Sequence, residues 1–455
     1  MRIHPRTAVA ALAVGTALSV TAMPGVALAD DTVRGKNRVL VVVVGFNDAT
    51  FPDESLVMKN AAESYFGAER SPAHYYSKMS RGQFTYVPAA EGKVVGPYHL
   101  DLPQNPCEAG AVREQTQKKL EADGYVKGED YDSISIIQPG EGAQCGWSGL
   151  GSVPGPNTWV SLGGDEISEA LLVHELGHNQ GYGHHMRDFC PDGDVSRCAE
   201  DGTSHKTPMG GGGSGVGLVA PELIHAGWLG GSQTRTVGAS GTYELVSLHG
   251  EKTGTRALDI PMGDDRLVVE YRHEVAGFPT DEGNLDAAVE GVHAYRVKDG
   301  DYANSVLLDP TEKSGSGRED AITTLTDRKI GLEVKVVKSG AGAATVAVSL
   351  NGKPAGAKPA AVPASPKAES PSAKPRKTEG DPISEEGTDA GKTHAGNADH
   401  KASETPDATP APDLAETGES SVSPYLAVGG IGLFGLGLVV VLGIRHRGRG
   451  RRGIA

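Results

Sequence analysis

Twelve consecutive residues, 174–185, constrain this chain more strongly than any other stretch of it. They read HELGHNQGYGHH and contain four of the fifteen histidines in the 455 residues. Apolar residues recur at helical spacing before and within the stretch, which predicts a half-buried helix with Asp165 as its N-cap. His174 and His178 lie four residues apart and would share one face of that helix, so the two imidazoles could bind a single zinc ion.

The residues around the histidine pair fit the same site. Glu175 would project beside both histidines without sharing their direction, which suits it to act on a water molecule at the metal rather than to be a ligand. Gly181 can adopt a positive φ and end the helix. The chain can then turn beneath the metal, so that His184 arrives from the opposite side as the third ligand. His185 points away from the ligand direction and is interpreted as a neighbour of the site.

The full pattern, His-Glu-x-x-His-x-x-Gly-x-x-His, resembles the metzincin signature. Plain surface histidines on a helix are the alternative interpretation, and the helix-breaking glycine at the required position argues against it. The resemblance also implies a methionine turn beneath the metal, for which Met209 in TPMGGGG is the candidate, as packing support and not as a ligand. Some metzincins have a tyrosine two residues later; here that position is Gly211, so no such tyrosine is expected.

A closer resemblance covers about residues 38–230. The chain looks like the gametolysin family of zinc metallopeptidases in five segments, in this order: RVLVVVVGFND, YYSKMSRGQFTYVPAAEGKVVGPY, HELGHNQGYGHH, TPMGGGG and LVAPELIHAGWL. This resemblance implies endopeptidase activity on extracellular proteins, with His174, His178 and His184 as zinc ligands and Glu175 as the catalytic base. It also implies an edge strand that pairs with the extended substrate, for which NTWVSL (157–162) is the candidate. His225 is interpreted as structural.

Strand-like and helix-like segments alternate over residues 34–230, which predicts an α/β catalytic domain. The resemblance adds a twisted mixed sheet, an active-site helix and a small C-terminal subdomain that carries the methionine turn. After Trp228 short strand-like runs are separated by Gly, Asp and Asn turns, so residues 231–351 are predicted to form an all-β accessory domain. RLVVEYRHEVAGF and GVHAYRV there are similar to the β-domain that follows catalytic domains in gametolysin-like and immune inhibitor A-like secreted peptidases.

Both ends of the chain are typical of export. Residues 1–29 have a charged start, a short apolar core and a small-residue exit, as in a secretory signal peptide. Residues 352–413 are rich in proline, alanine and charge, which predicts a disordered stalk. Residues 414–455 contain LAETG, an apolar span at 426–444 and five arginines. They resemble a sortase sorting signal, which implies cleavage between Thr417 and Gly418. An ordinary C-terminal anchor helix is the alternative.

The four cysteines are an even, small number, which in an exported protein indicates disulfide bonds. Three pairings are open. Closeness in sequence favours Cys190–Cys198, which leaves Cys107–Cys145. The alternative of a cysteine-rich zinc site would need short CxxC spacings, and these are absent. The acidic residues around the second pair form no calcium-loop pattern, so a disulfide-closed surface loop is predicted there.

The charge balance excludes one class of partner. The chain has 58 acidic and 43 basic residues and a net charge of −15, whereas nucleic-acid binding needs a basic surface.

The leading hypothesis is a monomeric, secreted zinc endopeptidase, attached to the wall of a Gram-positive bacterium by sortase. Its partners would be extracellular protein or peptide substrates and peptidoglycan. The alternatives are an adhesin with an inert metal site and an amidase that acts on wall peptides.

Overall fold

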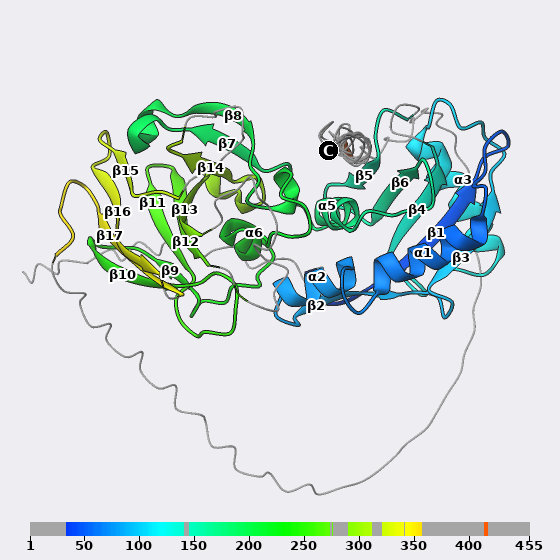
Figure 1. Cartoon of the computed structure of the whole chain (residues 1–455), viewed down its shortest axis with the longest axis horizontal. Coiled ribbons are helices and arrows are strands. Elements are labelled where there is room, and N and C mark those ends of the chain that lie inside the picture. Colours follow the sequence, from blue (N-terminus) through cyan, green and yellow to red (C-terminus); the bar gives the residue numbers. More distant parts are fainter. Residues whose placement is uncertain are drawn as a thin grey trace, which may run out of the picture.

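A computed structural model describes residues 33–140, 145–273, 275, 290–311, 321–340 and 342–356, together with the backbone of 414–416. These residues form two lobes with several sheets (Figure 1). The predicted signal peptide, the stalk beyond residue 356 and the apolar span at 426–444 lie outside the described residues. Within the described ranges no helix is both long and apolar enough to cross a membrane.

The first lobe is built on a mixed sheet around β1, Gly35–Gly45, which is the buried strand that the sequence predicts. Its parallel neighbours are β2 (Phe84–Pro88), β3 (Val94–His99) and β4 (Ser133–Pro139). The order continues through β6, Asn157–Leu162, which is parallel to β4, to the antiparallel strand β5, Gly149–Ser152. A last strand, β18 (Leu414–Glu416), pairs antiparallel with the outer edge of β5.

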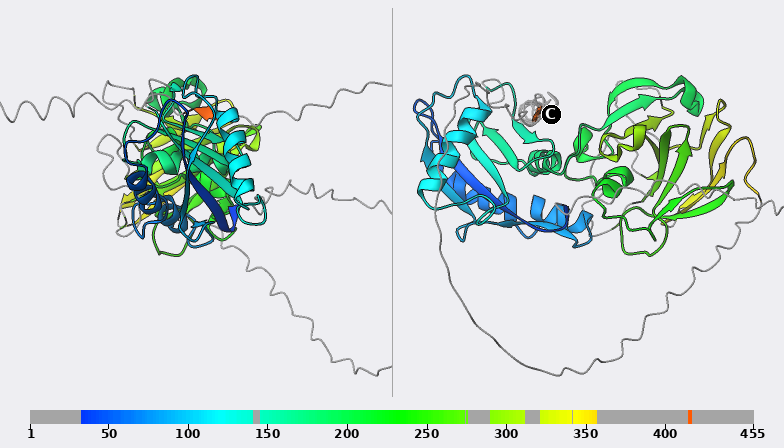
Figure 2. Two further views of the ribbon diagram at one scale, coloured as in Figure 1. Left: turned by 90° about the vertical axis from the view of Figure 1, so that its right-hand side faces the viewer. Right: turned by 180° about the vertical axis from the view of Figure 1, so that it is seen from behind.

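Helices cover both faces of this sheet (Figure 2). The lobe contains α1 (Glu54–Phe66), α2 (Pro72–Met79), α3 (Ala109–Ala122) and α5 (Glu169–Asn179). Alternate side chains of β1 point to opposite faces, as the two-residue period of a strand requires. Val39, Val41 and Val43 pack with α1, α2 and α5, whereas Leu40, Val42 and Val44 pack with α3. The helix α5, which carries the histidine motif, is therefore held by a buried strand of β-branched residues.

The second lobe contains two further sheets. One has the order β10-β17-β16-β15: Gly241–Val246, Ala343–Ser349, Leu332–Gly340 and Thr324–Asp327. The other has the order β8-β7-β14-β13-β12-β11-β9: Ala199–Thr203, Met186–Phe189, Val306–Asp309, Gly291–Val297, Asp265–Arg272, Ala257–Met262 and Thr234–Thr236. Most of these strands fall on the strand-like runs of the sequence.

The boundary at residue 230 does not separate the two lobes. β7 and β8 lie within the segment predicted as catalytic, yet β7 runs parallel to β14 and joins the sheet of the second lobe. The short helix α6, Ala220–His225, packs against β12 of that lobe. One hydrophobic core cluster runs through both lobes, from Val41 through Leu172 and Leu223 to Val268. The sequence did not indicate that β7 pairs with β14, because the two strands lie 120 residues apart in the chain.

The prediction that residues 157–162 form an edge strand is wrong. β6 occupies those residues, but it lies between β4 and β5 and is buried along its whole length. β5 is the strand that covers it. Its sequence, GLGS, has no strand pattern, and glycine is depleted in strands, so the sequence did not reveal it.

Candidate metal centre

The histidine motif begins on α5, whose ends differ slightly from the prediction. Ser168, not Asp165, is the N-cap, and its side chain accepts a hydrogen bond from the Leu171 N–H. Asp165 instead accepts hydrogen bonds from the side-chain amide of Asn60. The helix ends at Asn179, and Gly181 then adopts φ +96°, a left-handed conformation that glycine reaches without strain. This turn sends the chain back across the helix.

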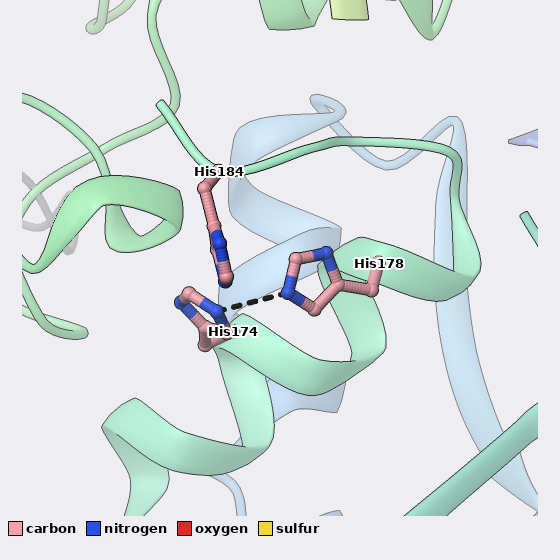
Figure 3. Close-up of side chains that lie close together, drawn as sticks. All are labelled: His174, His178 and His184. Carbon is pink, nitrogen blue, oxygen red and sulfur yellow. Dashed lines mark hydrogen bonds between the residues drawn. The ribbon is translucent and has the colours of Figure 1, made fainter. Parts of the chain in front are cut away.

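The structure brings His174, His178 and His184 together. One ligand nitrogen from each lies within 4.8 Å of the others. Figure 3 shows His174 and His178 rising from α5 and His184 descending from the returning chain. The Nε2 atoms of His174 and His178 are 3.0 Å apart, close to the spacing of about 3.3 Å expected for two nitrogens on one tetrahedral zinc ion.

Two backbone carbonyls orient the histidines on α5. Nδ1 of His174 donates to the carbonyl oxygen of Pro208 (2.8 Å), and Nδ1 of His178 donates to that of Tyr182 (2.7 Å). Each imidazole therefore carries its proton on Nδ1 and presents an unprotonated Nε2 to the other. Two such lone pairs facing each other repel, and a cation between them removes that repulsion. The arrangement fits a metal ion.

Burial keeps these imidazoles neutral. Desolvation lowers the pKa of His174 to about 4, against the hydrogen bond to Pro208, and lowers that of His178 to about 3. It also lowers the pKa of His184, which is the most exposed of the three. At neutral pH all three rings are then in the uncharged form that binds metals.

Glu175 is fully buried on the same helix, beneath strand β5. An ideal Cβ on Gly149 would lie 2.5 Å from its Oε1 atom, and one on Gly151 would lie 2.5 Å from its backbone oxygen. Both approaches are possible only because these strand residues are glycines. The two glycines allow the carboxylate of Glu175 to lie directly beneath β5, the strand that pairs with β18.

Met209 lies in the 3₁₀ turn Pro208–Gly210, against the underside of α5, and is fully buried. An ideal Cβ on Gly177 would lie 2.5 Å from its sulfur. The Thr207 hydroxyl lies 2.9 and 2.8 Å from the two carboxylate oxygens of Glu222, which also accepts from the Val219 N–H. Burial raises the pKa of Glu222 to about 8, although these hydrogen bonds oppose the rise. Glu222 thus ties α6 to the turn that carries Pro208 and Met209.

The other two histidines noted in the sequence are structural. Nε2 of His225 lies 3.2 Å from the backbone oxygen of Gln180, and its ring lies edge-on to Tyr182. His185 is buried against Tyr295 and bonds to Ser305, away from the three-histidine cluster. The sequence did not single out Glu222 or Tyr182, since neither is one of the fixed residues of the pattern His-Glu-x-x-His-x-x-Gly-x-x-His.

Two disulfide bonds are present, Cys107–Cys145 and Cys190–Cys198, which confirms the pairing favoured by closeness in sequence. The second bond closes the loop that follows β7. The first joins the start of α3 to the residues before β5. Every cysteine of the chain is thus paired.

Comparison with known proteins agrees with this site. Residues 38–256 match the family model of the gametolysin peptidases, M11. No curated protein matches the chain by sequence. Among solved structures, OgpA from Akkermansia muciniphila is 14% identical with a TM-score of 0.30, over 58% of this chain and 85% of that one. Archaemetzincin from Methanopyrus kandleri is 18% identical with a TM-score of 0.18, over 41% and 86%. These scores are too low to assign the fold. Residues 38–256, which contain the three-histidine cluster, therefore belong to the gametolysin M11 family of metallopeptidases.

Proposed function

We propose that the protein is an extracellular zinc endopeptidase in which Glu175 is the general base. The observation that carries the proposal is the facing pair of unprotonated Nε2 atoms, 3.0 Å apart, with the third imidazole of His184 beside them. Three neutral nitrogen ligands suit zinc and leave a fourth position open. A zinc ion held there would lower the pKa of a coordinated water molecule and polarise the scissile carbonyl.

Glu175 performs the proton transfers in this proposal. It follows directly after the ligand His174 on α5, and its carboxylate is buried beneath Gly149. From there Glu175 accepts a proton from the attacking water molecule and later donates it to the leaving amine. The surrounding low dielectric strengthens its interaction with charge that develops on the substrate.

The outer edge of β5 supplies a place for the substrate backbone. It accepts an extended, antiparallel chain in the structure, since Leu414–Glu416 pairs with Leu150–Ser152 there. A substrate that adds as a strand gains main-chain hydrogen bonds that do not depend on its sequence. This supports an endopeptidase that binds extended protein segments above Glu175.

Location outside the cell is part of the proposal. Both disulfide bonds favour an oxidising compartment. The predicted signal peptide, the predicted stalk and the resemblance of the sequence around Thr417 and Gly418 to a sortase signal favour export and attachment to peptidoglycan. The acidic chain would act there as a monomer on protein or peptide substrates.

The test uses a Glu175→Gln variant of the full chain with its zinc content measured. We expect zinc binding to be retained and cleavage of an unfolded protein to fall by at least about 100-fold, as for other general bases. Glu166→Gln, which changes an exposed glutamate three residues before α5, is the matched control and should keep full activity.

Full activity in Glu175→Gln would contradict the mechanism. The alternatives give different results in the same preparation. An adhesin would bind its surface after zinc is chelated and after Glu175 is changed. A wall-peptide amidase would release peptidoglycan fragments and leave the protein substrate intact.

A further inference from the structure

The three histidines come from two different lobes. His174 and His178 stand on α5, which packs against β5 of the first lobe. His184 lies two residues before β7, which belongs to a sheet of the second lobe. β7 pairs with β14 from its first residue, with Met186 opposite Val306. The third ligand is therefore joined to the second lobe by a strand. It is joined to α5 by the turn at Gly181 and by the hydrogen bond from Nδ1 of His178 to the Tyr182 carbonyl oxygen.

Two adjacent residues of the second lobe contact the chain on either side of His184. The Oδ1 atom of Asn304 lies so close to Gly183 that an ideal Cβ there would approach it to 2.0 Å. The Oγ atom of Ser305 lies 3.1 Å from Nε2 of His185. The residues on either side of His184 therefore both contact this pair: Gly183 contacts Asn304, and His185 contacts Ser305.

Those two residues are themselves held in place. The side-chain amide of Asn304 donates to Oδ2 of Asp301 (2.8 Å), while Oδ1 of Asp301 accepts from the Ala303 N–H (3.1 Å). Tyr302 anchors the same turn to β11, because its hydroxyl donates to Oδ2 of Asp259 (3.0 Å). The turn Tyr302–Asn304 is therefore held by hydrogen bonds to residues of the second lobe.

We propose that Asn304 and Ser305 are positioning residues for the third metal ligand, so that the second lobe sets the metal affinity of the site. The inference rests on the proposed zinc function and extends it, since it makes the β-rich lobe a part of the metal centre. Residues that orient a ligand typically change metal affinity by about 10–100-fold when they are lost.

The test measures the zinc dissociation constant by competition with a coloured chelator, using the full chain and no substrate. Gly183→Ala should weaken zinc binding by about 10–100-fold, because its methyl group displaces Asn304 and shifts His184. Asn304→Ala should weaken binding by about tenfold. The double variant Gly183→Ala/Asn304→Ala should bind more tightly than Gly183→Ala alone, because the collision has been removed.

Two controls make the result specific. Gly164→Ala places a methyl group on a glycine with no heavy atom within 4 Å of that position and should leave zinc binding unchanged. The His184→Ala variant gives the zinc dissociation constant of the site without its third ligand. Thermal unfolding of each metal-free variant reports whether the fold survives the change.

The outcomes separate the inference from the function on which it rests. If the parent binds zinc and loses it in His184→Ala, but Gly183→Ala and Asn304→Ala bind within twofold of the parent, the positioning role is refuted and the zinc site stands. If the parent binds no zinc, the proposed function fails and the inference fails with it.

Discussion

Gly177 and Met209 are in direct contact across the face of α5 that packs on the turn Pro208–Gly210. An ideal Cβ on Gly177 would lie 2.5 Å from the Met209 sulfur and 3.0 Å from the hydroxyl oxygen of Tyr76. Gly177 lies between His174 and His178 in sequence, and Met209 follows Pro208, whose carbonyl oxygen orients His174. The contact therefore couples the packing beneath the helix to the geometry of the metal site.

Gly177→Ala should destabilise the protein by about 1–3 kcal/mol, because the added methyl group overpacks a site with no free volume. The free energy of unfolding in urea measures this. Gly110→Ala in α3, where no heavy atom lies within 4 Å of the added Cβ, is the matched control and should not destabilise the fold. Equal stability of the two variants would show that Met209 is not packed as described.

The stability should depend on pH through Glu222. Burial raises its pKa to about 8, above the value of about 4.5 in the unfolded chain, so the folded state holds a proton that the unfolded state releases between these pH values. Stability from this group is fully present below pH 4.5 and is lost as the pH rises towards 8, with a slope of at most about 1.4 kcal/mol per pH unit.

Glu222→Gln should remove this slope, since the amide cannot ionise. Urea unfolding at pH 5, 6.5 and 8 gives the comparison, with Glu166→Gln as the exposed control. The variant is expected to lose less stability than the parent between pH 5 and pH 8. Parallel profiles would mean that Glu222 is ionised throughout this range in the folded protein.

The segment Leu414–Glu416 should compete with the substrate, because it occupies the outer edge of β5 with Ala415 opposite Gly151. A chain that ends at Asp413 should have a KM roughly two- to tenfold lower than the full chain and an unchanged kcat, since a tethered segment acts at a high effective concentration. A further truncation to residue 356 should not lower the KM any further. An equal KM for all three chains would exclude competition by this segment.

The two disulfide bonds should differ in their contribution to stability. The loop closed by Cys107–Cys145 spans 38 residues, whereas Cys190–Cys198 spans 8. Loop-closure entropy predicts a loss of about 4 kcal/mol for the paired alanine variant of the first bond and about 2.5 kcal/mol for the second. Urea unfolding of the two double variants measures both losses of stability. The prediction would be wrong if removing Cys190–Cys198 destabilised the protein more than removing Cys107–Cys145.

Local patterns of the sequence led to the parts of the site that depend on local geometry. The spacing of His174 and His178 follows from the helical period, and the positive φ of Gly181 follows from its lack of a side chain. The disulfide pairs were indicated by their distances along the chain. The strand predicted from RVLVVVVGF also forms, because an unbroken β-branched run suits a strand buried on both faces.

The misplaced features all depend on long-range pairing. β5 was overlooked in favour of β6, since only the assembled sheet decides which of two neighbouring strands is outermost. Ser168 caps α5, whereas Asp165 bonds to Asn60, a residue of α1 that lies 105 positions earlier in the chain. The strand β7, which precedes the boundary predicted at residue 230, joins a partner 120 residues away.

The sequence by itself indicated which side chains could bind a metal and which residue beside them could carry a proton. Only the tertiary structure decided how those side chains are held. Pro208, Glu222 and Asn304 reach the site from turns and helices that the chain order leaves far apart. Ligand identity is a property of residue type and local spacing, whereas ligand orientation depends on contacts that form only when both lobes have folded.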